Sequence, residues 1–217
     1  AGMDVKLWMV GGTAWLLFAG IATAGDNNTL YLTQVGDGGA LPNTFYADQS
    51  NSVGNSIVAS QSGSGNVAHI ITSGLCGENL ATPCGSVGLH QTNTGLETNE
   101  APVAVGDTLA RNYVSITSSG DSSATVLQTG DGNSATLNVV SGSGNIQQTG
   151  NDNLASLTVR DGTNGSIVQT NNHNTAALEV TGVAGAGASL TQTGGQTYTG
   201  PIVVNTIVPG TVEIVQN

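Results

Sequence analysis

The sequence predicts an all-β fold: a β-solenoid of strand-turn-strand coils about 20 residues long, preceded by an N-terminal hydrophobic α-helix. Three observations predict it: a repeated motif, an alternation of apolar and polar side chains within each copy, and an unusual composition. Of 217 residues only 8% are charged and 4% are aromatic, whereas 32 are glycine. A core of large side chains beneath charged helices is therefore not expected, and repetition must supply the order.

The clearest copies of the motif occupy residues 122–180. Aligned on a glutamine, they are VLQTGDGNSATLNV from Val126, IQQTGNDNLASLTV from Ile146 and IVQTNNHNTAALEV from Ile167, spaced by 20 and then 21 residues. A degenerate copy starts at Leu190, and ASQSGSGNVAHIIT, which contains Gln61, keeps the same register upstream. A fixed period of this length is the signature of coils that stack on one another.

Within each copy, apolar residues alternate with polar ones on both sides of a turn rich in Gly, Asn and Asp. Such alternation is typical of a strand with one buried face, and the turn residues supply the positive φ angles of a chain reversal. Strands of about five residues rise only ~17 Å and need stacked neighbours for stability. The predicted core comprises Val126, Ile146, Ile167, Leu137, Leu157, Leu178, Val139, Val159 and Val180.

Glutamine and asparagine recur in phase with these apolar residues, which indicates that they also point inward. Stacked amides can hydrogen-bond from coil to coil, whereas stacked lysine or arginine would repel. The alternative is that the amides are surface residues of a polar repeat. The expected ladders contain Gln61, Gln128, Gln148, Gln169 and Gln192, and Asn66, Asn133, Asn153 and Asn174.

The uncharged segment 7–24 contains both tryptophans and differs from everything after it. One interpretation is an export signal peptide, because the run ends in the small-x-small pattern Ala22-Thr23-Ala24. The other, which we favour, is a retained apolar helix of about 18 residues that spans a bilayer or packs in a filament core. Both predict an extracellular or cell-surface protein that meets a membrane only during export or through residues 7–24.

The predicted organisation has four regions: the helix at 1–24, a first β-repeat region at 25–71, an insert at 72–120, and a second β-repeat region at 121–217. The insert contains Cys76 and Cys84, the only cysteines. We expect a local disulfide there, because two thiols without a nearby histidine do not make a zinc set and an exported protein meets oxidising conditions.

Composition also excludes or disfavours several function classes. With Lys6, Arg111 and Arg160 as the only Lys or Arg residues and a formal charge of −11, the chain has no basic surface for nucleic acid. The histidines are scattered through the sequence without a recurring carboxylate, so we expect no enzyme activity and no cofactor. GDG at 36–38 and 130–132 offers too few ligands for calcium.

The last residues, TVEIVQN, repeat the pattern of the first strand of a coil and then stop. An open strand with this pattern is a template for another chain. We expect self-assembly with copies of the same chain through this half coil, at Val212, Ile214 and Gln216, or through the first coil, at Leu30 and Leu32.

The spacing Gln-x-Gly-x-x-Asn-x-Ala resembles curlin repeats, the units of the major subunit of curli fibres. The resemblance covers residues 122–180 well and extends to Gln61, Gly63, Asn66 and Ala68. It departs at Asn171, where the repeat has glycine, and at Val139, Val159 and Val180, where it has a second glutamine. The resemblance implies a self-assembling extracellular fibre subunit. The alternatives are a monomeric solenoid that acts as an adhesin or binds ice or polysaccharide, and a pilin-like subunit.

Overall fold

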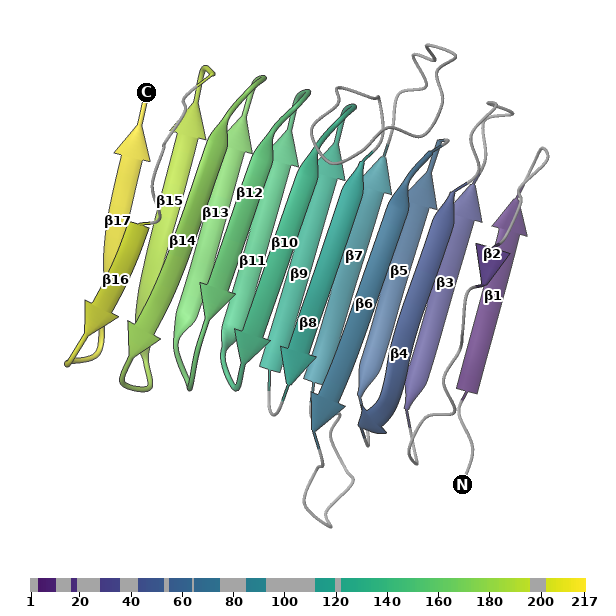
Figure 1. Ribbon diagram of the computed structural model, residues 1–217, viewed down its shortest axis with the longest axis horizontal. Helices are drawn as coiled ribbons and strands as arrows, with labels where there is room; N and C mark the ends of the chain where they lie inside the picture. Colours follow the sequence, from purple (N-terminus) through teal and green to yellow (C-terminus); the bar gives the residue numbers. More distant parts are fainter. Residues whose placement is uncertain are drawn as a thin grey trace.

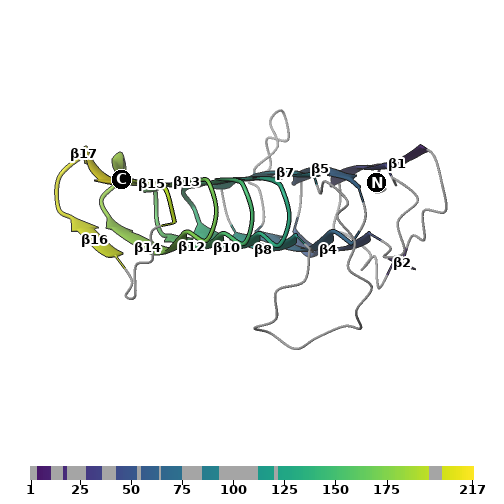
Figure 2. The same ribbon diagram turned by 90° about the horizontal axis from the view of Figure 1, so that it is seen from above.

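The computed structural model describes residues 4–10, 17–18, 28–35, 43–52, 55–63, 65–74, 85–92, 112–119, 122–195 and 202–217. In these residues the regular structure is all β, and the strands wind into a β-solenoid of two facing parallel sheets (Figures 1 and 2). The predicted fold class is confirmed in this respect.

The odd-numbered strands form a nine-stranded sheet, which we call sheet A, in chain order along the axis. Its strands are β1 (Asp4–Val10), β3 (Thr29–Val35), β5 (Ser56–Ser62), β7 (Gly85–Thr92), β9 (Ser122–Thr129), β11 (Ser143–Thr149), β13 (Asn164–Thr170), β15 (Ala186–Thr193) and β17 (Gly210–Gln216).

The even-numbered strands form the eight-stranded sheet B, again in chain order. Its strands are β2 (Leu17–Phe18), β4 (Thr44–Ser52), β6 (Val67–Gly74), β8 (Tyr113–Ser119), β10 (Ser134–Val140), β12 (Leu154–Val159), β14 (Thr175–Gly182) and β16 (Ile202–Thr206). Each coil therefore contributes one strand to each sheet. Figure 2 shows the two sheets as parallel layers, with the turns between them seen as arcs.

Coil length varies while the strand register of sheet A does not. Equivalent glutamines lie 20 and 21 residues apart in the regular block, but 27, 30 and 37 residues apart toward the N-terminus. Strand pairing stays in step through these longer coils, as in Gln61↔Gln91↔Gln128. The additional residues therefore lie between strands, where loops tolerate insertion.

The core is the space between the two sheets, filled by every second residue of each strand. All nine predicted core residues lie there with at most 2% of their surface exposed. Phe45 is the one fully buried aromatic side chain among the described residues. The core is therefore a stack of narrow layers made of Leu, Ile, Val and Ala.

The expected N-terminal helix is not confirmed. Where the structure describes this segment it has strands instead: β1 pairs with β3 from Asp4↔Thr29 to Val10↔Val35, and β2 pairs with β4. The physical reason is that the edge of β3 offers unpaired backbone groups, which a strand satisfies and a helix does not. Among the described residues there is no apolar helix of membrane-spanning length.

The region 72–120, expected as an insert, contains two strands that continue the solenoid. Strand β7 joins β5 to β9 in sheet A, and β8 joins β6 to β10 in sheet B. The segments 75–84 and 93–111 on either side of β7 lie outside the described residues, and so do Cys76, Cys84 and their expected disulfide.

Candidate functional site

The most extended polar feature of the described structure is a ladder of eight buried or half-buried glutamines inside sheet A. Each except Gln216, the last, donates from Nε2 to Oε1 of the glutamine in the following coil, over 2.6 to 3.0 Å. The bonds all have the same direction, from the N-terminal coil toward the C-terminal coil. The members are Gln34, Gln61, Gln91, Gln128, Gln148, Gln169, Gln192 and Gln216.

The second hydrogen of each interior amide reaches across the core to sheet B. Nε2 of Gln148 donates to the carbonyl of Ser134 at 3.0 Å, and Nε2 of Gln169 donates to the carbonyl of Leu154 at 2.9 Å. Equivalent bonds occur from Gln61 to Gln192. The ladder therefore ties each coil to the next and also ties the two sheets together, which satisfies polar groups that would be costly to bury unpaired.

Asparagine forms the second predicted ladder, at the turn that leads into each sheet B strand. Oδ1 of one asparagine accepts the backbone N–H of the next, for example Asn133 to Asn153 at 3.1 Å and Asn153 to Asn174 at 3.0 Å. Nδ2 donates to turn carbonyls, such as that of Gly150 at 2.7 Å from Asn133. The ladder contains Asn43, Asn66, Asn112, Asn133, Asn153 and Asn174.

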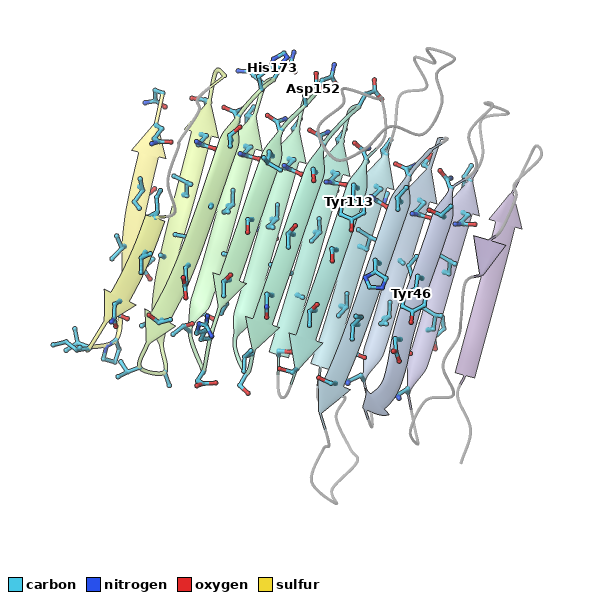
Figure 3. All side chains as sticks on the ribbon, viewed as in Figure 1. Tyr46, Tyr113, Asp152 and His173 are labelled. Atoms are coloured by element: carbon cyan, nitrogen blue, oxygen red, sulfur yellow. The ribbon has the colours of Figure 1, made fainter. Side chains whose placement is uncertain are left out.

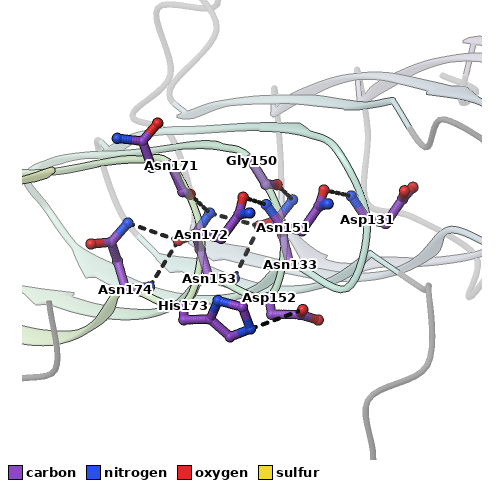
Figure 4. Close-up of polar contacts among 10 residues, drawn as sticks. All are labelled: Asp131, Asn133, Gly150, Asn151, Asp152, Asn153, Asn171, Asn172, His173 and Asn174. Carbon is purple, nitrogen blue, oxygen red and sulfur yellow. Dashed lines mark hydrogen bonds and ion pairs between the residues drawn. The ribbon is translucent and has the colours of Figure 1, made fainter. Parts of the chain in front are cut away.

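The turns themselves stack on one another (Figure 4). Oδ1 of Asn172 accepts the N–H of Asn151 at 2.7 Å, and Oδ1 of Asn151 accepts the N–H of Asp131 at 3.0 Å. Beside this row His173 Nε2 lies 3.5 Å from Asp152 Oδ2, and the two side chains are 72% and 37% exposed. An exposed pair of this kind contributes little to stability.

Close approach of successive turns explains where glycine is needed. A Cβ on Gly150, at φ +112°, would lie 2.2 Å from the carbonyl oxygen of Asn171. The equivalent Asn171 itself has φ 71°, a left-handed conformation that asparagine tolerates. At Asn171 the departure from the repeat pattern is therefore to a residue type that can adopt the backbone conformation of the turn.

The C-terminal end of the solenoid presents strands whose outer edges have no neighbour within the described chain. Sheet A ends at β17 and sheet B at β16. Ile214 packs partly against the core, Val212 is 40% exposed and Gln216 is half-buried. Gln216 Oε1 accepts from Gln192 at 2.8 Å, which leaves the Gln216 Nε2 as the last donor of the described ladder.

At the N-terminal end of the solenoid, in contrast, the outer edge of β3 is covered by β1. Leu30 and Leu32, expected at an assembly edge, are buried in β3 between β1 and β5. The ladder position opposite Gln34 in β1 is Met9. A thioether has no N–H to donate, so the glutamine pattern stops at this coil boundary.

The outer faces of the sheets are flat and polar, with few charges (Figure 3). One row on sheet A consists of threonines in direct register, namely Thr92, Thr129, Thr149, Thr170 and Thr193. On sheet B the rings of Tyr46 and His69 stack with centroids 4.6 Å apart. Thr129, Thr149 and Thr170 are recognisable in the sequence as outward threonines of the repeat, whereas Thr92 lies 37 positions before Thr129 and joins the row only through strand register.

The described residues contain no group of three or more His, Cys, Asp or Glu side chains able to hold a metal ion. A shallow depression lies where the turns lead into the sheet A strands β9, β11 and β13. Its lining includes Ser122, Ser141, Gly142, Ser143 and Asn164. The polar chemistry of the described chain is therefore dominated by stacked amides and hydroxyls.

All nine amides that the sequence assigns to the two ladders lie in them in the structure. Sequence reasoning did not assign Gln34, Gln91, Asn43 and Asn112. Gln34 and Gln91 are recognisable as half-motifs, YLTQVGDGG and LHQTN, but Asn112 is separated from its glutamine by the segment 93–111.

Comparison with known proteins gives no match: no family model, curated protein or solved structure is similar to this chain.

Proposed function

We propose that this chain is the structural subunit of an extracellular bacterial filament, in which copies stack end to end and continue both sheets from one copy to the next. The growing polymer is then a single long solenoid. Its partners are copies of the same chain.

The observation that carries the proposal is the C-terminal coil. Strand β17 keeps the register of every earlier sheet A strand, with Gln216 in the amide ladder and Ile214 in the apolar column. Its outer edge carries one charged residue, Glu213, and has neither a bulge nor a proline. Monomeric proteins usually block such an edge, because exposed N–H and C=O groups recruit another strand.

The resemblance of residues 122–180 to curlin repeats supports the same proposal, because that family forms fibres outside the cell. The near absence of Lys and Arg also fits, since charges stacked at the coil spacing of about 4.8 Å repel.

The test is to incubate the purified chain and follow filaments by negative-stain electron microscopy and X-ray diffraction. We expect unbranched filaments with a reflection near 4.8 Å along the axis. Ile214→Lys places a charge inside the junction and should abolish filaments, while Val215→Lys, on the outer face of the same strand, should not. Soluble monomers from the unaltered chain at all concentrations would refute the proposal.

A second candidate function rests on the threonine row of sheet A. Five hydroxyls in register on a flat face offer a repeating array to ice or to a polysaccharide, as in a monomeric adhesin. Replacing Thr149 and Thr170 by Lys and measuring binding to insoluble polysaccharides and thermal hysteresis would test it, with a monomer expected in solution.

A further inference from the structure

Building on the proposed filament, we propose that β1 is a replaceable cap: it occupies the edge of β3 in the isolated chain and is displaced when β17 of a second copy takes its place. Displacement of β1 is then the step that controls growth.

The register of the two strands makes them interchangeable. In β1, Val5, Leu7 and Met9 lie opposite Leu30, Leu32 and Gln34. In β17, the residues in the same columns of sheet A are Val212, Ile214 and Gln216. A copy of β17 laid on β3 in this register places apolar residues in the two columns where β1 has them and glutamine where β1 has methionine.

The direction of the ladder distinguishes the two occupants. Gln34 donates to Gln61 at 2.6 Å, so its Oε1 is the acceptor left for the preceding coil. Within the described ladder no glutamine of a preceding coil donates to this oxygen, because the position opposite Gln34 in β1 is Met9. Met9 cannot supply a donor, whereas Gln216 has one at Nε2. Exchange therefore joins the Gln34 acceptor to the Gln216 donor and continues the ladder across the junction.

Sheet B leaves room for the same event. Strand β2 pairs only with Thr44 and Phe45 of β4. Strand β16 begins at Ile202, whose column in sheet B runs through Leu178, Leu157, Leu137, Ile116 and Ile70 to Ala47. The β16 of a second copy would thus add to the part of β4 beyond β2. Of the strands that the structure describes, only β1 has to leave.

The exchange also has a thermodynamic direction. The Gln216 side chain of another copy can donate a hydrogen bond to Gln34, whereas methionine in β1 cannot, so exchange adds one hydrogen bond to the ladder. Breaking the β1–β3 pairing first is a barrier, so a monomer with β1 in place is a slow starting point for growth.

A reversible lock on β1 tests the inference in the full chain. Trp8 and Thr33 are direct register partners on neighbouring strands, and strands spaced about 4.8 Å apart allow a disulfide between such positions. The double variant Trp8→Cys/Thr33→Cys locks β1 to β3 when oxidised. The matched control Thr33→Cys/Ser60→Cys locks β3 to β5, which stay together in the exchange.

We expect the oxidised β1–β3 variant to elongate at least tenfold more slowly than the same variant after reduction, and the control to elongate equally in both states. Equal elongation of the oxidised and reduced β1–β3 variant would overturn the cap and leave the filament proposal standing. Absence of filaments from the unaltered chain and from the control in both states would overturn the filament proposal, and the cap with it. The variant Met9→Gln gives an independent check, because a donor supplied to Gln34 should stabilise the cap and lengthen the lag.

Discussion

The coils between residues 122 and 180 and those between 28 and 92 share one glutamine ladder but fill the space beside it differently. In the first block the sheet A column contains Gly144 and Gly165, and the facing sheet B column contains Val139 and Val159. A Cβ on Gly144 would lie 2.9 Å from the methyl groups of Leu137 and Val139. Sheet B thus supplies the volume.

In the N-terminal block, at the equivalent register positions, the large apolar side chains belong to sheet A and the polar side chains to sheet B. Sheet A contributes Leu30, Ile57 and Val87, whereas sheet B contributes Gln49, at a bulge, and Thr72. The two blocks show that the fold keeps the combined side-chain volume between the two sheets constant, although the sheet that supplies the larger side chain differs. The amide ladder is the feature common to both.

The largest expected effect comes from breaking the shared ladder in the regular block. Gln148→Leu removes the acceptor of Gln128 and the donors to Gln169 and to the Ser134 carbonyl, all within 3.0 Å. Because these groups stay buried, we expect the free energy of unfolding to fall by about 4 kcal/mol in urea denaturation. Gln34→Leu, at the end of the described ladder, should cost about half as much. Equal costs at both sites would show that the ladder is no stronger in its middle.

An intermediate effect is expected from adding a methyl group to the core at a glycine of sheet A. A Cβ on Gly165 would lie 2.7 Å from Val159 Cγ2 and 2.8 Å from Leu157 Cδ1, so Gly165→Ala should destabilise the protein by about 2 kcal/mol. Combining it with Val159→Ala should recover at least ~1 kcal/mol relative to the sum of the single variants.

Gly88 provides the matched control for this volume exchange. It lies in β7 of the N-terminal block, and its Cβ would meet only the side chain of Thr125, at 3.8 Å. Gly88→Ala should therefore change stability by less than ~1 kcal/mol. Strict additivity of Gly165→Ala and Val159→Ala would argue against compensation across the core.

The smallest effect is expected at the exposed turn. His173→Asn removes the contact with Asp152 and keeps a residue that tolerates the φ of 61°. Because the His173 side chain is largely exposed and solvent screens the contact, the free energy of unfolding should change by less than ~0.5 kcal/mol. A thermal unfolding measurement at low and high salt checks this, and a large loss would mean that the turn pair supports the asparagine ladder.

The parts of this structure that could be predicted are those in which local pattern and packing agree. Alternation placed Val126, Leu137 and Val139 in the core, and the phase of Gln128 placed the ladder, because a one-residue shift would expose the whole set. The repeat supplied the stacking order as well.

What could not be predicted depends on pairing over long distances in the sequence. Tyr113–Ser119 carries only alternating residues, and its place beside β6 and β10 follows from register rather than from a motif. Asp4–Val10 precedes a long apolar run, and an apolar run by itself does not distinguish a strand from a helix. Pairing with β3 decides the matter.

The shared direction of the amide bonds has an electrical consequence. In a β-sheet the backbone dipoles alternate along each strand and nearly cancel. The side-chain amides from Gln34 to Gln192, in contrast, all donate an N–H toward the C-terminal coil. Their moments add, so the rod has a positive pole at β17 and a negative pole at β3. Two such rods attract head to tail and repel head to head, which gives any polymer of them a single polarity.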